Sequence, residues 1–153
     1  MPVPVEIGII SDTHGLLRPE AVLALEGCAE VLHAGDVCSE RIVGELAELV
    51  APCHAVRGNC DADPGLPGFV LRALGGSRVL VHHGHQPFDE EALAPDVVIT
   101  GHTHVPLIES RGGVLRINPG SAGPRRFRLP VSVARLTLGE GPPRARIIEL
   151  DVA

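Results

Sequence analysis

Short apolar runs alternate with glycine, proline and polar clusters along the whole chain, and this pattern predicts a mixed α/β fold. In the N-terminal third, three apolar runs each end in polar residues, and two helical stretches separate them. We expect strands at 5–10, 31–33 and 53–56, a helix over 20–26 opened by Pro19, and a helix capped by Ser39 that runs to Val50. Strands that alternate with helices favour parallel pairing.

After Pro67 the pattern becomes rich in strands. We expect extended segments at 69–74, 78–82, 97–100, 107–109, 114–117, 131–138 and 144–150, with a helical turn at 90–93. The pairs Gly75-Gly76 and Gly112-Gly113 are typical of hairpin turns. A parallel part followed by a strand-rich part predicts an α/β fold in which a two-sheet β-sandwich is flanked by helices. With 153 residues, residues 1–153 fit a single domain.

Composition narrows the classes of protein. The hydrophobic share of 44% and the charged share of 21% are ordinary for a globular chain. No apolar run approaches the roughly 20 residues that cross a bilayer. The first ten residues lack the charged flank and the small-residue cleavage site of a secretory signal. We therefore expect a cytoplasmic protein without a membrane partner.

The charge balance disfavours an extended nucleic-acid partner. Thirteen basic against nineteen acidic residues give a net charge of -6, the opposite of what phosphate backbones attract. Three Phe with no Trp or Tyr leave little surface on which bases could stack. The expected partner is small, and a homo-oligomer stays open. Four cysteines, Cys28, Cys38, Cys53 and Cys60, match no paired zinc-ligand spacing and are predicted to be reduced thiols.

Eight histidines against one methionine point toward metal or acid–base chemistry. Side chains of metal-ligand type follow five of the predicted strands. Ligands bind beyond the carboxyl ends of strands in open α/β sheets, so we expect these side chains to converge. Residues two apart on an extended segment share a face, which predicts paired ligands in the first and last cluster. The candidates are Asp12 with His14, Asp36, Asn59, His83, and His102 with His104.

Seven donors are too many for one tetrahedral zinc and suit two divalent cations. A carboxylate can bind two ions roughly 3.5 to 4 Å apart, and Asp36, alone after its strand, is the candidate bridge. Two dications, two aspartates and a bridging hydroxide sum to one positive charge, which would attract an anionic phosphate ester. In this hypothesis the hydroxide attacks the ester in line.

Six short motifs, in this order, resemble those of the calcineurin-like metallophosphoesterases, and of their small bacterial and archaeal phosphodiesterases in particular. They are DTH at 12–14, GD at 35–36, GNCD at 58–61, HGH at 83–85, GHTH at 101–104 and NPGS at 118–121. The resemblance spans residues 7 to about 121. It implies a phosphodiesterase in which Asp36 and Asn59 are catalytic and Mn is the expected metal, with Fe, Zn or Ni as alternatives. It also implies one metal on Asp12, His14, Asp36 and His104, and the other on Asp36, Asn59, His83 and His102.

The chain departs from the broader superfamily at Cys60. Many relatives carry a His there that meets the substrate, and a thiol with a pKa of about 8.5 is a poor acid for an alkoxide leaving group. We therefore expect slow turnover of unactivated esters and faster turnover of aryl esters. Cys60, His85 and Arg57 are the candidate substrate contacts; a loop role for His85 and a solvated Arg57 are the alternatives.

Two further groups of residues and a rival function complete the prediction. His33, His54 and His82 are expected to be structural. The arginines at 125, 126 and 128 follow the NPGS turn, and a solvated loop is favoured over substrate recognition.

The rival function is a protein-interaction scaffold, because eukaryotic trafficking complexes use a similar fold with a degenerate metal site. Here every ligand position is filled, which favours an enzyme. The natural ester stays open among cyclic nucleotides, nucleotide derivatives and phospholipid head groups.

Overall fold

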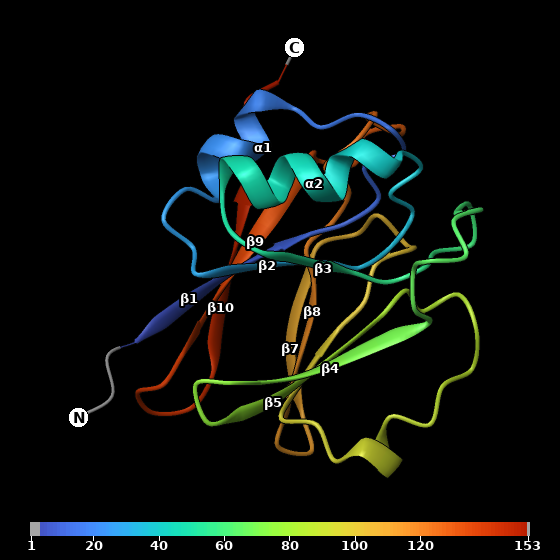
Figure 1. Ribbon diagram of the computed structural model, residues 1–153. Coiled ribbons are helices and arrows are strands. Elements are labelled where there is room, and N and C mark those ends of the chain that lie inside the picture. The colour runs from blue at the N-terminus through green and yellow to red at the C-terminus, as the bar shows by residue number, and fades with distance from the viewer. Residues whose placement is uncertain (1–3, 153) are drawn as a thin grey trace.

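The computed structural model describes residues 4–152 and shows two five-stranded sheets packed against each other (Figure 1). In the first sheet the order is β10-β9-β1-β2-β3. Strands β1, β2 and β3 are parallel, as their alternation with helices predicts, while β9 runs antiparallel to both β1 and β10. The strands are β1 (Val5–Ile10), β2 (Glu30–His33), β3 (Cys53–Ala55), β9 (Ser132–Leu138) and β10 (Arg144–Glu149).

The second sheet has the order β4-β5-β6-β8-β7 and is also mixed. Two hairpins, β4-β5 and β7-β8, flank a parallel centre of β5, β6 and β8. Both hairpins turn at the predicted glycine pairs, and all four of these glycines have positive φ. The strands are β4 (Phe69–Leu74), β5 (Ser77–His82), β6 (Val97–Ile99), β7 (Leu107–Arg111) and β8 (Val114–Asn118).

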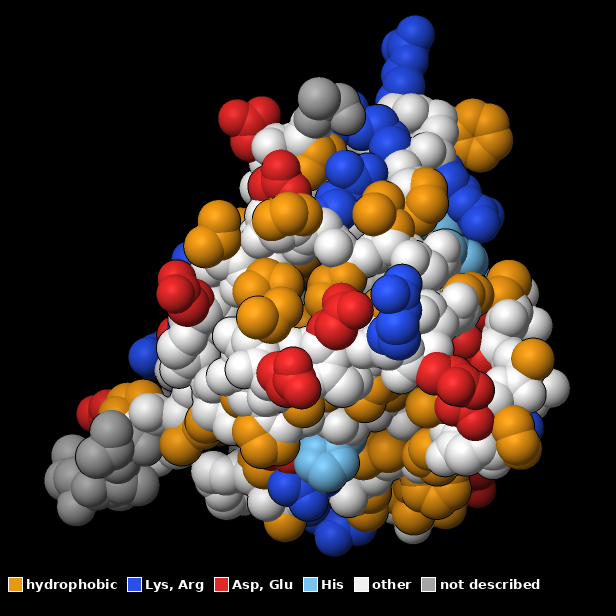
Figure 2. Space-filling view, turned by 45° about the horizontal axis from the view of Figure 1, so that its top comes forward, with side chains coloured by type: hydrophobic (Ala, Val, Ile, Leu, Met, Phe, Trp, Pro, Cys, Tyr) orange, Lys and Arg blue, Asp and Glu red, His pale blue; other side chains and the backbone are white. Residues whose placement is uncertain are grey.

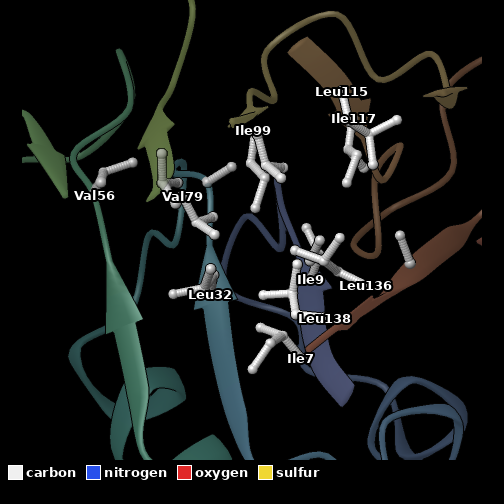
Figure 3. Packing of buried hydrophobic residues seen from close by; sticks show 14 residues of the cluster. Ile7, Ile9, Leu32, Val56, Val79, Ile99, Leu115, Ile117, Leu136 and Leu138 are labelled. Atoms are coloured by element: carbon white, nitrogen blue, oxygen red, sulfur yellow. The ribbon is translucent and has the colours of Figure 1, made fainter. Parts of the chain in front are cut away.

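The main core lies between the two sheets. Alternate residues of β1, Ile7 and Ile9, point into it together with Leu32, and the other sheet contributes Val79 and Ile99 (Figure 3). All five are fully buried. Period-two alternation of a strand sends its remaining residues to the opposite face. Ile10 lies on that opposite face of β1, where it meets the residues that pack with the helices.

Two helices cover the outer face of the first sheet, α1 (Pro19–Ala24) and α2 (Glu40–Leu49) (Figure 1). Leu25 and Leu46 pack with Ile10 in this second core. Pro19 opens α1 as predicted, and the Ser39 side chain caps α2. The second sheet has only a 3₁₀ turn, η1 (Glu91–Leu93), among the described residues, so the helical flank belongs to one sheet. No helix within residues 4–152 combines the length and apolar character needed to cross a membrane.

The topology brings the ends of five strands to one edge of the sandwich. Strands β1, β2 and β3 of one sheet and β5 and β6 of the other all end there, and backbone hydrogen bonds link the loops that follow them. The N–H of Asp12 donates to the carbonyl of Gly35 at 2.9 Å, and the N–H of Gly101 donates to that of His83 at 3.1 Å. The loops that carry the candidate ligands are therefore fixed to one another.

Candidate metal centre

The structure brings all seven candidate ligands together at this edge. One group surrounds the Oδ1 atom of Asp12, which lies 3.2 Å from His104 Nε2 and 3.6 Å from His14 Nε2. Asp12, His14 and His104 offer ligand atoms that all lie within 4.8 Å of one another. One oxygen and two imidazole nitrogens at such distances can surround a single divalent cation.

A second group surrounds the Oδ1 atom of Asn59. His83 Nε2 lies 3.0 Å from it and His102 Nδ1 lies 3.1 Å from it. Asp36 connects the two groups, because its Oδ2 atom lies 3.3 Å from His83 Nε2 and 3.6 Å from His14 Nε2. The Asp36 carboxylate therefore stands between the two sets of donors.

Hydrogen bonding fixes which ring nitrogen of His83 faces the cluster. Its Nδ1 atom lies 2.7 Å from the carbonyl oxygen of Ala34, which can only accept, so Nδ1 carries the proton. In the neutral imidazole the Nε2 lone pair is then free and points toward Asp36. A carbonyl that holds the far nitrogen of a ligating histidine is the usual support for a metal ligand.

Three buried polar atoms of the seven candidate ligands have no hydrogen-bond partner among the described residues: Asp12 Oδ1, His14 Nε2 and His104 Nδ1. Asp12 is fully buried. Buried polar atoms are nearly always satisfied, so an orphaned carboxylate oxygen facing imidazole nitrogens needs a reason. Carboxylate oxygen, amide oxygen and imidazole nitrogen are donors that Mn, Fe, Zn and Ni accept. The residues fit the metals that the sequence suggested.

The backbone at the ligands corrects one expectation. Asp12, His14, His102 and His104 do not lie on extended segments, because β1 ends at Ile10 and β6 at Ile99, and their φ angles are 55°, 46°, 71° and 64°. Left-handed φ costs a non-glycine residue about 1 to 3 kcal/mol and is typical of functional sites. The ligands converge because the chain turns sharply at each of them.

The carboxyl group of Asp36 is held ionised. Burial by itself would raise its pKa, but the backbone N–H of Cys60, which donates to Oδ1 at 2.8 Å, and the neighbouring imidazoles outweigh burial and lower it. The position of Gly58 completes this packing, since a Cβ there would overlap the Asp36 carboxylate. A side chain of any other kind at Gly58 would therefore disturb the shared donor.

Asp61 is a residue of the site that sequence reasoning missed. Its Oδ2 atom accepts the N–H groups of Asp36 at 2.9 Å, Gly58 at 2.8 Å and Val37 at 3.3 Å, and its Oδ1 accepts that of Cys38 at 2.9 Å. Asp36 and Cys38 both have left-handed φ. Asp61 therefore holds the strained turn that carries Asp36. The GNCD motif contains it, but the sequence gives no sign that its oxygens face backbone N–H groups.

His33 supports the same loops from the interior. It is fully buried, and its Nδ1 accepts the N–H of Gly35 at 3.1 Å, so Nε2 donates to the Thr13 hydroxyl at 3.0 Å. Burial lowers its pKa to about 4, so the ring is neutral. His54 and His82 instead contact Glu30 and Glu90 at 2.8 and 2.6 Å. All three lie outside the two ligand groups.

Most of the chain matches one known protein superfamily. The family model of the calcineurin-like phosphoesterase superfamily domain matches residues 5–141. The chain belongs to this superfamily. It is 36% identical over 143 residues to the probable metallophosphoesterase YsnB of Bacillus subtilis, covering 85% of this chain and 82% of that protein.

Two further relatives show the range of the superfamily. Phosphodiesterase YfcE of Escherichia coli is 34% identical over 155 residues, with 82% of this chain and 84% of that protein covered. The crystal structure of Vps29 from Entamoeba histolytica complexed with Zn²⁺ superposes with a TM-score of 0.70 at 27% identity, covering 96% of this chain and all of that one. The two-sheet fold is thus the metallophosphoesterase fold.

The three candidate substrate contacts of this metallophosphoesterase differ in placement. Cys60 is exposed beside the centre, and its Sγ forms a group within 4.8 Å with donor atoms of His14 and Asp36. The ring of His85 lies 5.2 Å from that of His83, and its buried Nδ1 has no partner among the described residues. The Arg57 side chain is exposed and makes no hydrogen bond or ion pair within residues 4–152. The structure brings the first two to the centre and, among the described residues, shows no contact of the Arg57 side chain with it.

Proposed function

We propose that this metallophosphoesterase hydrolyses small phosphodiesters at a centre of two divalent cations, with Mn as the expected metal. Asp36 is the shared ligand. Asp12, His14 and His104 complete one metal site, and Asn59, His83 and His102 complete the other. The observation that carries the proposal is the position of Asp36 Oδ2, 3.6 Å from His14 Nε2 and 3.3 Å from His83 Nε2. One carboxylate oxygen in reach of both donor groups supports a shared ligand.

The chain gives this cluster a charge that suits an anionic substrate. Bound divalent cations lower the pKa of water toward neutrality and offset negative charge on phosphoryl oxygens. Of the seven proposed ligands, Asp12 and Asp36 are anionic, while Asn59 is neutral. Hydrogen bonding keeps the proton of His83 on Nδ1, away from the cluster. Two negative ligands against two dications leave a positive centre, which attracts a phosphate ester.

A groove beside the cluster supports a small substrate. It has a volume of about 600 Å³ and is lined by Cys38, Cys60 and Asp61 together with residues near the start of α2. Small-molecule sites typically have volumes of about 300 to 1,000 Å³. The groove shares Cys60 with the neighbourhood of His14 and Asp36. A substituent of a phosphoester bound at the cluster can therefore enter it.

The preference for diesters rests on the relatives, since YfcE is named a phosphodiesterase. A scaffold without catalysis is the rival, because Vps29 shares the fold. The complete set of seven donors favours the enzyme, because a scaffold has no need of an orphaned buried carboxylate oxygen such as Asp12 Oδ1.

The test compares two aryl substrates with and without metal. Protein stripped by a chelator is assayed on bis(p-nitrophenyl) phosphate and on p-nitrophenyl phosphate, before and after Mn²⁺ is restored. We expect activity to need the metal and the diester to be the better substrate. Asp12→Asn should abolish activity, while Asp89→Asn should retain it, because the exposed Asp89 side chain accepts only the N–H of Ala92 in a local turn away from the cluster and the groove. Absence of hydrolysis in the Mn-loaded protein would favour the scaffold, and a better monoester would contradict the diester preference.

A further inference from the structure

A short loop after β8 carries the strongest local concentration of positive charge near the centre. Residues 124–129, Pro-Arg-Arg-Phe-Arg-Leu, form what we call the arginine loop. Its first five residues are exposed. Three arginines in six residues contrast with the net charge of -6 of the whole chain. Positively charged side chains gather at the top of the view in Figure 2, where a hydrophobic side chain stands clear of the surface.

The arginine loop begins on the backbone that carries Asp12. The N–H of Ala122 donates to the carbonyl of Ser11 at 3.0 Å, and the Ser121 hydroxyl donates to the carbonyl of Asp12 at 3.0 Å. A Cβ at Gly123 would overlap the backbone of Thr13, so the two segments are in direct contact. In Figure 1 the orange segment after β8 passes beside the blue segment after β1. The loop is therefore attached to the ligand-bearing turn.

Arg126 lies three residues beyond Gly123, whose backbone contacts Thr13 between the proposed ligands Asp12 and His14. Burial and the Asp36 charge raise the pKa of the Cys60 thiol, and the Arg126 guanidinium opposes them. Burial also lowers the pKa of His104, and Arg126 adds to that effect. Cys60 and His104 belong to different loops of the cluster, and the effect of Arg126 on both agrees with the attachment of its loop to the Asp12 turn.

The charge of Arg126 is not committed to another group. Its guanidinium has no hydrogen-bond or ion-pair partner within residues 4–152, whereas Arg125 donates to the carbonyl of Val152 at 3.3 Å. An arginine beside a metal cluster, with its planar set of donors free, is suited to phosphoryl oxygens, which it can bind through two parallel hydrogen bonds.

Phe127 is the most exposed large apolar side chain among the described residues, at 94%. It has a left-handed φ of 53°, in a turn where the N–H of Leu129 donates to the carbonyl of Arg126 at 3.1 Å. This conformation is unfavourable for a bulky residue, and no packing within the described chain compensates for it. An aromatic ring held out beside a phosphate-binding arginine offers a flat surface to a planar group.

We propose that the arginine loop is a substrate-binding element of this enzyme. Arg126 contacts the non-bridging phosphoryl oxygens, and the ring of Phe127 packs against a planar aromatic substituent of the ester. The preferred substrates are therefore aryl or nucleoside phosphodiesters rather than alkyl ones. The inference rests on the proposed function and replaces the solvated loop that the sequence favoured.

The role of Arg126 is tested by phosphate binding as well as by activity. In the Mn-loaded protein, Arg126→Ala should weaken the binding of inorganic phosphate, followed by calorimetry, about tenfold to a hundredfold, the range for a charge-assisted hydrogen bond. Phe127→Ala should leave phosphate affinity unchanged. Arg111→Ala is the matched control. Arg111 is an exposed arginine at the last residue of β7, whereas the proposed ligands His102 and His104 precede the first residue of that strand, and it pairs with Glu109. Equal phosphate affinity in the wild type and Arg126→Ala would overturn the assignment of Arg126.

The role of Phe127 is tested with two diesters that share a leaving group. Bis(p-nitrophenyl) phosphate and methyl p-nitrophenyl phosphate both release p-nitrophenolate. The first keeps an aryl group on the phosphate, and the second keeps a methyl group. Phe127→Ala should lower kcat/KM for the bis-aryl ester about fivefold to a hundredfold, the range for stacking on an aromatic side chain. Phe127→Tyr should stay within about twofold of the wild type because it keeps the ring.

The outcomes separate this inference from the proposed function. Absence of metal-dependent hydrolysis in the wild type would defeat both. An active wild type whose Phe127→Ala variant hydrolyses both diesters at unchanged rates would defeat the inference alone, and would point to a protein or membrane partner for the exposed ring. Because residues 124–128 are exposed, we expect these variants to unfold at the wild-type temperature, so a loss of activity reports on binding.

Discussion

Asp36 and Asp61 brace each other through the backbone. The carboxylate of Asp61 accepts the N–H of Asp36 at 2.9 Å, and the carboxylate of Asp36 accepts the N–H of Cys60, next to Asp61, at 2.8 Å. Each side chain thus fixes the turn that carries the other. The orientation of the proposed shared ligand, Asp36, therefore depends on two loops, which follow the neighbouring strands β2 and β3.

Replacing Asp61 should damage the apo-protein as well as the centre. Asp61→Asn substitutes a donor for one of two oxygens that together accept four N–H groups, so at least one of these N–H groups loses its acceptor. We expect the free energy of unfolding in urea, measured in chelator, to fall by about 1 to 3 kcal/mol. Asp63→Asn, which affects one local turn, should change it by no more than about 0.5 kcal/mol. Equal stability of the two variants would refute the bracing role.

Two glycines make a second matched pair. A Cβ at Gly58 would overlap Asp36, whereas a Cβ at Gly44, an exposed position within α2, meets nothing within 4 Å. We expect Gly58→Ala to weaken Mn²⁺ binding and lower stability. Gly44→Ala should raise the free energy of unfolding by about 0.5 to 1 kcal/mol, because alanine favours the helix. Thermal unfolding and metal titration check both, and a Gly58→Ala protein with wild-type metal affinity would contradict the packing argument.

His33 should make stability depend on pH. Its pKa is lowered from 6.5 to about 4 by burial, so below pH 6.5 the unfolded chain binds a proton that the folded chain does not. Stability is therefore fully present above pH 6.5 and is lost as the pH falls toward 4, by about 3 kcal/mol in all. In urea titrations of the apo-protein, His33→Gln should lose this component. Parallel curves of stability against pH for the two proteins would rule it out.

Hydrolysis should depend strongly on the leaving group. Burial and the Asp36 charge raise the pKa of Cys60, so its thiol cannot protonate an alkoxide efficiently. We expect kcat for a series of aryl phosphodiesters to rise with the acidity of the released phenol. Cys60→Ser should leave that slope unchanged. A rate that does not vary with the acidity of the phenol would show that another group acts as the acid.

Much of the fold follows from hydrophobic periodicity and turn residues. The β-α-β-α-β order up to Ala55 and the two glycine hairpins agree with the pattern of the sequence. The sequence does not show that β9 and β10 join the first sheet, because strand pairing across more than a hundred residues depends on tertiary packing. Helix α1 ends at Ala24, two residues before the predicted end. Gly27, with φ at 85°, accommodates the turn that follows.

The candidate ligands could be predicted from the sequence because their residue types and their positions after strands are visible there. Histidines and aspartates that follow strands identified the cluster, because the carboxyl ends of parallel strands share an edge. The extended geometry expected at Asp12 and His14 was wrong, since left-handed turns at non-glycine residues are stabilised by distant contacts such as the hydrogen bond from His14 N–H to the Asp36 carbonyl. Asp61 was missed as a site residue for the same reason, because most of its partners lie on the loop that follows β2.

The number of Mn²⁺ ions bound per chain, measured by equilibrium dialysis and elemental analysis, decides whether Asp36 is shared between two metal sites. We predict two ions in the wild type and in Asp63→Asn, and fewer than two in Asp36→Asn, because a neutral amide at the shared position weakens both sites. A wild type that binds a single ion, or an Asp36→Asn variant that binds two with wild-type affinity, would contradict the account.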